Sequence, residues 1–174
     1  FVDWRPYLGH DMNMPCDTSI NINRLKDLAQ KIINIPDGFT VNRQVKKVLQ
    51  DRSKMASGEQ SLDWGCAELL AYASLVDDNY KVRLTGQDGG RGTFSHRHAD
   101  LFDRKTGNTH TRQPGLTEKP ENFTIYDSLL SEVAVLAFEY GYATTMPNAL
   151  VVWEAQFGDF ANSAQVVIDQ FITS

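Results

Sequence analysis

The second half of the sequence alternates between strand and helix patterns, and this alternation restricts the fold more than any other feature. Strands are expected at Tyr80–Gly86, Phe123–Tyr126 and Ala149–Trp153, and helices at Ser131–Thr144 and Ala161–Ile172. Strands that are connected through helices pair in parallel. The pattern therefore predicts the α/β class, a three-layer sandwich in which helices cover both faces of a mainly parallel sheet. Ligands bind such sheets at the carboxyl ends of the strands.

The first part of the chain is predicted to be an extended arm followed by helices. Residues 1–19 show no periodicity, whereas apolar residues recur at helical spacing over residues 22–32. A second helix is expected to begin at Thr40, and its basic face, which includes Arg52, is expected to lie in solvent. The segment Leu62–Val76 contains good helix formers and few charges, so it is expected to be a mostly buried helix.

The length of the chain suits one domain. With 174 residues, of which 41% are hydrophobic, it can form one sizeable core and is short for two. We expect residues 1–60 to form the arm and the helices that lead into the domain, and residues 61–174 to form the domain core. The polar segment Arg104–Pro120 is assigned to a long loop. Because the chain begins without Met, we interpret it as a piece of a longer protein.

The charge and the cysteines argue against several classes of partner. A net charge of -5 gives no electrostatic reason to expect nucleic acid or an anionic membrane as a partner. No apolar run approaches the roughly 18 residues of a membrane span. Cys16 and Cys66 are expected to be free thiols in a reducing compartment.

Glu132 stands at the start of the helix expected before the last strand. The stretch Val133–Phe138 is apolar on every face, which is typical of a helix buried all round. Ser128 or Ser131 is expected to cap the first turn. An acid in the first turn often only compensates the helix dipole. Here Glu139 lies two turns further along the same face, and burying two unpaired carboxylates is costly, so a functional role for Glu132 is favoured.

The motif QFGDF, residues 156–160, directly follows the strand that ends at Trp153. Two phenylalanines three residues apart, Phe157 and Phe160, belong more often to a core than to a ligand site. Their position at the carboxyl edge of a sheet instead favours an aromatic wall for a flat ligand, next to a glycine turn at Gly158.

The motif GQDGGRGTFSHRH covers residues 86–98 and follows the first expected strand. It matches neither the P-loop nor the dinucleotide-binding pattern. The spacing of its histidines, without a third ligand nearby, argues against a zinc site, and no metal ligands are assigned. Arg91, His96, Arg97 and His98 supply the cationic and donor groups that a dicarboxylate needs. The alternative is a polar loop exposed to solvent.

With these motifs in order, the chain resembles the family of thiamine-diphosphate-dependent 2-oxoglutarate dehydrogenase first components. More narrowly, it resembles their transketolase-like pyrimidine-binding domain. The resemblance rests on GQDGGRGTFSHRH, on DSLLSEVAVLAFEYGYA and on WEAQFGDFANSAQVVIDQF. It covers residues 62–174 well and the first sixty residues more loosely.

The resemblance implies a role for each candidate residue. Glu132 would hydrogen-bond N1′ of the cofactor's aminopyrimidine and so promote removal of the C2 proton, the catalytic step assigned to it. Phe157 or Phe160 would line the pyrimidine pocket, and the resemblance does not choose between them. Arg91, His96 and His98 would face the substrate, 2-oxoglutarate. The G-D-G and distant Asn that bind Mg²⁺ and the diphosphate in this family are absent from the chain, so another domain is expected to hold them.

The resemblance also implies partners and a location. The succinyl group left after decarboxylation would pass to a lipoyl-bearing succinyltransferase, and the site would lie between the subunits of a homodimer. This chain alone would be inactive. The enzyme would work in the bacterial cytoplasm or, in a eukaryote, in the mitochondrial matrix, as an oxidoreductase of the tricarboxylic acid cycle.

Two alternatives stay open at this point. One is a sister enzyme that acts on 2-oxoadipate. The other is a non-catalytic α/β interaction domain, in which Glu132 is only a first-turn acid and the histidines lie on the surface. An ion pair between Glu132 and an arginine on the opposite edge would favour the interaction domain, whereas Glu132, Phe157 and Phe160 at one sheet edge would favour the enzyme.

Overall fold

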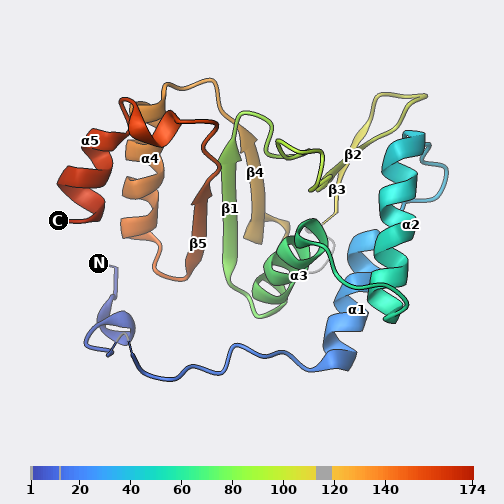
Figure 1. The fold of residues 1–174 in the computed structure, drawn as a ribbon, viewed down its shortest axis with the longest axis horizontal. Coiled ribbons are helices and arrows are strands. Elements are labelled where there is room, and N and C mark those ends of the chain that lie inside the picture. The colour runs from blue at the N-terminus through green and yellow to red at the C-terminus, as the bar shows by residue number, and fades with distance from the viewer. Residues whose placement is uncertain (1, 12, 113–118) are drawn as a thin grey trace.

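A parallel sheet forms the centre of the computed structural model, which describes residues 2–11, 13–112 and 119–174 (Figure 1). Its strands are β1 (Lys81–Gly86), β4 (Phe123–Asp127) and β5 (Ala149–Trp153), in the order β4-β1-β5. Both outer strands pair with β1 in parallel. The α/β class and the three expected strands are confirmed, to within one residue at their ends.

Helices cover both faces of this sheet. On one face, Val82 of β1 and Phe123 of β4 belong to the same buried cluster as α3 (Trp64–Asp77). Arg83 alternates to the other face, where it contacts α4 (Glu132–Thr145). The last turns of the chain, α5 (Gln165–Val167) and a π-helix at Ile168–Ile172, lie beside α4 (Figure 1).

The remaining helices extend the core beyond α3. The helices α1 (Ile22–Ile33) and α2 (Arg43–Ser57) pack on each other, and α1 also packs on α3. Each helix begins at a residue whose side chain accepts a hydrogen bond from a main-chain N–H of the first turn: Asn21, Asn42 and Asp63. Because Asn42 is the cap, α2 begins three residues later than its apolar pattern suggests.

The first residues form an arm with a short 3₁₀ turn at Arg5–Tyr7. The arm runs along the amino ends of the strands to α1 (Figure 1). Its start is attached to the far helix, because the indole Nε1 of Trp4 donates to the carbonyl of Thr144 at 2.9 Å. The rings of Trp4 and Tyr7 meet edge to face, with centroids 5.9 Å apart. The expected arm therefore links both ends of the domain.

The prediction of a long loop at Arg104–Pro120 was wrong in part. The strands β2 (Asp100–Phe102) and β3 (Thr109–Thr111) pair in antiparallel fashion as a small hairpin. Strands of three residues are too short for an alternating pattern to stand out in sequence. Residues 113–118 of the predicted loop lie outside the described residues. The hairpin is followed by a 3₁₀ turn at Pro120–Asn122 that leads into β4.

The expected closing helix at Ala161–Ile172 was wrong in form. The chain makes a 3₁₀ turn at Asp159–Ala161, three α-helical residues and then the π-helical turn. Ala164 and Val167 are the buried residues of this segment. A segment that packs on one side through so few residues gains little from regular helix geometry.

The structure also tests the expectations for a membrane span and for the two cysteines. None of the helices they form is long and apolar enough to cross a membrane. Cys16 is exposed and Cys66 is buried, and both are free thiols, as expected. Burial raises the pKa of the Cys66 thiol, while the charge of Arg52 acts in the opposite direction.

Candidate functional site

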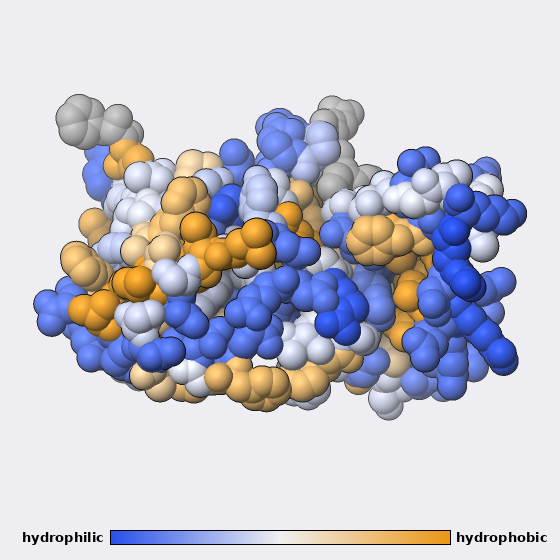
Figure 2. Space-filling model, turned by 90° about the horizontal axis from the view of Figure 1, so that it is seen from above, coloured by the Kyte–Doolittle hydropathy of each residue, from blue (hydrophilic) through white to orange (hydrophobic). Residues whose placement is uncertain are grey.

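The carboxyl ends of the parallel strands form one edge of the molecule, which Figure 2 shows from above. On this face hydrophobic side chains gather in groups separated by hydrophilic ones. Segments that follow the strands carry large exposed apolar residues: Leu129, Leu130, Phe157 and Phe160. Such residues are candidates for contact with a ligand or with another protein surface.

Glu132 lies at this edge, at the first residue of α4. Its carboxylate Oε2 accepts a hydrogen bond from Ser163 Oγ at 3.3 Å, not from an arginine. The side chain of Glu132 borders a small pocket with Gly86 and Trp153, at the ends of β1 and β5. The capping prediction was wrong, because Ser131 occupies the cap position without a side-chain hydrogen bond. Ser128 instead accepts from the N–H of Leu130.

The prediction that α4 is buried all round was also wrong. Within α4 only Val135 and Glu139 are buried, and Phe138 is 55% exposed. The sequence shows that the helix is apolar, but it does not show what covers each side. In this chain the sheet and the last turns cover α4 on part of its surface only (Figure 1).

Glu139, the second acid on α4, has a structural partner. Arg83 donates to both of its oxygens, at 2.7 and 2.9 Å, and Thr85 Oγ1 donates at 2.8 Å. The guanidinium also lies over the rings of Tyr126 and Tyr142, at 4.3 and 4.7 Å from their centroids. The bond to Glu139 raises the pKa of Arg83. The charge of Glu139 is therefore neutralised inside the fold, whereas Glu132 remains at the edge.

The QFGDF segment, residues 156–160, connects the surroundings of Glu132 to an aromatic pocket. Asp159 borders the small pocket around Glu132, while Phe157 and Phe160 line a neighbouring pocket of about 450 Å³. Gly158 makes the expected turn, with a φ of 79° that few other residues adopt. The predicted residues Glu132, Phe157 and Phe160 thus share one sheet edge, but they line adjacent pockets, not a single one.

Aromatic rings dominate the second of these pockets. Phe157 is 85% exposed, and its ring meets Phe94 edge to face with centroids 6.5 Å apart. Phe94 in turn lies 6.1 Å from the imidazole of His96. Glu154, the first residue after β5, completes the wall. The pocket therefore offers flat apolar surfaces beside a histidine and a carboxylate.

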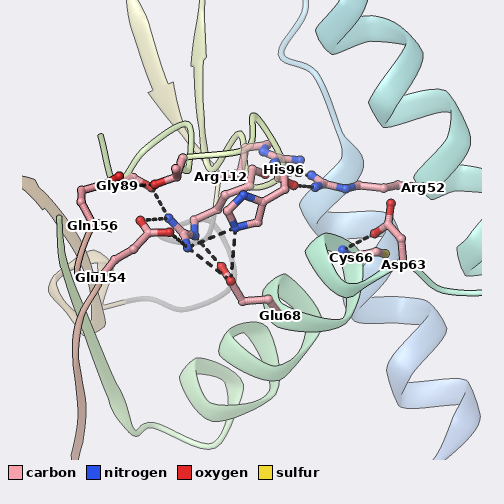
Figure 3. Close-up of polar contacts among 11 residues, drawn as sticks. Arg52, Asp63, Cys66, Glu68, Gly89, His96, Arg112, Glu154 and Gln156 are labelled. Atoms are coloured by element: carbon pink, nitrogen blue, oxygen red, sulfur yellow. Dashed lines mark hydrogen bonds and ion pairs between the residues drawn. The ribbon is translucent and has the colours of Figure 1, made fainter. Parts of the chain in front are cut away.

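Arg97 does not face a ligand, so its assignment to substrate binding was wrong. It is 2% exposed and donates to Glu68 of α3, to Glu154 at 2.9 and 3.1 Å and to the carbonyl of Gly89 at 2.8 Å. Figure 3 shows Glu68 and Glu154 directed toward the same guanidinium from α3 and from the end of β5. Burial lowers the pKa of Arg97, but the bonds to Glu154 and Glu68 outweigh it and raise this pKa overall.

The other three predicted substrate residues fall into two places. His96 lines the aromatic pocket, with Nε2 at 3.6 Å from Glu68 Oε2. Arg91 and His98 border a different pocket, of about 690 Å³, between the loop and α2. Arg91 pairs with Asp88 at 2.5 Å. Burial, with the nearby charges of Arg52 and Arg112, lowers the pKa of His98.

Sequence reasoning missed two buried arginines behind this loop. Arg52 was expected in solvent but is 1% exposed, and Arg112, after β3, is 3% exposed. Both donate to main-chain carbonyls of residues 96–98 (Figure 3). Arg52 lies in a basic run that resembles a solvated helix face, so no sequence signal marked it. In the described ranges no group of three or more His, Cys, Asp or Glu side chains could hold a metal ion.

Comparisons with known proteins agree with this architecture. The family model described as the transketolase pyrimidine binding domain matches residues 60–174. The chain is 58% identical over its whole length to the 2-oxoglutarate dehydrogenase E1 component of Azotobacter vinelandii, and 50% identical over 99% of its length to that of Coxiella burnetii. It is 46% identical over 90% of its length to the mitochondrial 2-oxoglutarate dehydrogenase of Schizosaccharomyces pombe. It spans 18%, 18% and 16% of these relatives, respectively.

Proposed function

Because this chain belongs to the transketolase pyrimidine-binding domain family, we propose that it holds the aminopyrimidine of thiamine diphosphate in a 2-oxoglutarate dehydrogenase first component. The enzyme would catalyse oxidative decarboxylation of 2-oxoglutarate and transfer the succinyl group to a lipoyl carrier. One observation carries the proposal: a glutamate at the amino end of a helix lies beside an aromatic pocket at the carboxyl edge of a parallel sheet.

The residues at this edge suit an aminopyrimidine. A flat heteroaromatic ring needs an apolar wall, and Phe157 and Phe160 offer exposed ring faces. Among the described residues, the one side chain that donates to Glu132 is Ser163, at the long distance of 3.3 Å, so most of its hydrogen-bonding capacity is left for a ring nitrogen. When bound, thiamine diphosphate supplies the electron sink for carbon–carbon cleavage. We assign Mg²⁺ and the diphosphate to residues outside this chain.

In this proposal Glu132 moves a proton at one ring nitrogen. Its carboxyl would share a proton with N1′ at the pocket that it borders together with Gly86, Val135 and Trp153. Glu139 cannot substitute for it, because Arg83 already binds both of its oxygens. The two acids of α4 thus divide into one for chemistry and one for folding.

We further propose that His96, Arg91 and His98 serve the substrate. His96 would act from the aromatic pocket beside the cofactor, and Arg91 and His98 from the pocket against α2. Charge-assisted hydrogen bonds from arginine and histidine are strong contacts for a carboxylate, and 2-oxoglutarate carries two carboxylates. The 2-oxoadipate alternative differs by one methylene, which a pocket distinguishes by about 1–3 kcal/mol. Residues outside this chain would set that preference.

We also propose that the enzyme is a homodimer and works with a lipoyl-bearing succinyltransferase. The exposed apolar residues at the carboxyl edge support a second subunit. The bacterial and mitochondrial relatives are in keeping with activity in the cytoplasm or the mitochondrial matrix.

The direct test is decarboxylation of 2-oxoglutarate by the full-length enzyme with thiamine diphosphate and Mg²⁺. We expect Glu132→Gln to lower kcat by about 100-fold or more, the usual contribution of a positioned acid or base. Glu59→Gln, on the surface beyond α2, is the matched control and should keep wild-type activity. Absence of activity in the wild type, or equal activity in both variants, would instead support the interaction domain. Activity only with 2-oxoadipate would support the sister enzyme.

A further inference from the structure

Two buried arginines hold the main chain of the His96–His98 loop from behind. Arg52 of α2 donates to the carbonyl of Arg97 at 2.9 Å and to the carbonyl of His96. Arg112 donates to the carbonyl of Arg97 at 3.3 Å and to the carbonyl of His98. Every carbonyl of the triplet therefore accepts a hydrogen bond from a guanidinium group.

These arginines are costly to bury. Within the described residues neither makes an ion pair with a carboxylate, and the Nε of each has no hydrogen-bond partner. A charge that is buried loses its hydration, and this costs free energy unless an opposite charge and hydrogen bonds replace the water. Burial accordingly lowers the pKa of Arg52 and, with the repulsion from Arg52, brings that of Arg112 to about 9. Arg112 also donates to the carbonyl of Ile32 at the end of α1, which is a structural contact. In the part of the chain that the structure describes, the other hydrogen bonds of the two guanidinium groups all go to the carbonyls of residues 96–98.

What the arrangement achieves is a fixed direction for two histidines. Ser95 and His98 adopt left-handed conformations, with φ of 52° and 46°, which cost free energy in residues other than glycine. His96 is left lining the aromatic pocket and His98 lining the pocket against α2. The hydrogen bonds from the guanidinium groups therefore offset the strain in the main chain of this loop. They hold the side chains of His96 and His98 in two separate pockets.

Two glycines allow the main chain to approach His96 closely. A Cβ atom at Gly65 of α3 would lie 2.5 Å from the carbonyl oxygen of His96. A Cβ atom at Gly92 would lie 2.5 Å from Cε1 of the His96 ring. Contacts this short do not occur, so both glycines are needed for the observed position of His96. The histidine is held from its main-chain side and from its ring side.

We propose that Arg52 and Arg112 are positioning residues. Their hydrogen bonds to the carbonyls of the loop would fix the directions in which His96 and His98 meet the substrate. Arg52 acts through His96 and Arg112 through His98, and both act through the carbonyl of Arg97. The inference rests on the proposed function, because it takes the two histidines as substrate ligands. Lysine would keep the charge but lose the planar fork that spans two carbonyls.

The test uses the full-length enzyme with Arg52→Lys and Arg112→Lys. We expect the KM for 2-oxoglutarate to rise by about 10-fold to 100-fold, the usual effect of a misplaced ligand group, while kcat changes by less than about threefold. The matched control is Arg24→Lys, because Arg24 makes ion pairs with Asp77 and Asp78 of the α3 end. Wild-type KM in Arg52→Lys and Arg112→Lys would overturn the inference, as would an equal rise in Arg24→Lys.

A double-mutant cycle separates positioning from a merely structural role. If Arg112 acts through His98, then Arg112→Lys combined with His98→Asn should have the KM of His98→Asn alone. The same holds for Arg52→Lys with His96→Asn. Losses that multiply in both pairs would overturn the inference, as would wild-type KM in both histidine variants. The proposed function fails separately, through the absence of 2-oxoglutarate decarboxylation or its indifference to Glu132→Gln.

Discussion

At the scale of single residues, environment distinguishes the two glutamates of α4. Glu132 and Glu139 lie seven positions apart on one helix face, and the sequence pattern alone does not show which side chain is paired inside the fold. The structure buries Glu139 against Arg83 and leaves Glu132 at the carboxyl edge of the sheet. Function and folding are therefore expected to separate when each acid is replaced.

This separation predicts opposite effects on stability and activity. Glu139→Gln leaves the Arg83 guanidinium buried without a charge partner, so it should lower the free energy of unfolding by about 3 kcal/mol. Glu132→Gln should change the free energy of unfolding by less than about 1 kcal/mol, because its hydrogen bond is long and partly exposed. Urea unfolding of residues 1–174 measures both. Equal losses of stability in the two variants would contradict the assignment.

His98 gives a prediction on pH. Its pKa is lowered from 6.5 by burial and by the two arginines, so the folded chain resists its protonation. Between the lowered value and 6.5 the unfolded chain binds more protons, and stability is lost as the pH falls through this range. Unfolding free energies at about pH 7.5 and about pH 5.5 should differ more in the wild type than in His98→Asn. Parallel losses in the two proteins would show that His98 is not the group involved.

At the scale of elements, the strands were predictable and the coverage of the helices was not. Short apolar runs such as Ala149–Trp153 mark strands, and helical spacing marks α1. No residue of β5 is fully buried, so the run indicated the strand and not its burial. The β2–β3 hairpin was missed because each strand has three residues. The burial of Arg52 was missed because a helix pattern cannot show that a loop 44 residues later will use its guanidinium. The order of strands and helices predicted that the candidate residues lie at the carboxyl edge of the sheet. Their distribution over separate pockets depends on tertiary contacts, which the sequence pattern does not show.

The contact between α3 and the histidine loop can be tested through two helical glycines. Gly65→Ala would place its Cβ on the carbonyl of His96, and such overpacking should lower the free energy of unfolding by about 1–3 kcal/mol. Gly141→Ala in α4 is the matched control, because a Cβ there meets nothing within 4 Å. It should raise the free energy of unfolding by about 0.5–1 kcal/mol, since alanine favours helices. Stabilisation by both substitutions would contradict the close approach of α3 to the loop.

At the scale of the whole molecule, the carboxyl edge is more apolar than a free surface requires. Leu129 is fully exposed, and Phe157 and Phe160 are more than half exposed. Apolar groups of this kind on one side of a protein mark an interface. The placement agrees with the proposal that the site is completed by a second subunit.

The proposed contact between subunits can be measured by sedimentation of the full-length enzyme. Leu129→Asp puts a charge on the proposed contact and should weaken the dimer by about tenfold or more. Leu62→Asp is the control, because Leu62 is 47% exposed just before α3 and borders a pocket with Ile22 and Leu25 of α1. Identical dimer dissociation constants for Leu129→Asp and Leu62→Asp would contradict a subunit contact at Leu129.

The central claim is that Glu132 activates thiamine diphosphate, and exchange of the cofactor's C2 proton with deuterium tests it without any substrate. The measurement compares the full-length wild type, Glu132→Gln and Glu59→Gln, each saturated with thiamine diphosphate and Mg²⁺. We predict exchange in Glu132→Gln that is slower by about 100-fold or more, with Glu59→Gln equal to the wild type. Exchange at the wild-type rate in Glu132→Gln, with cofactor bound, would contradict the account.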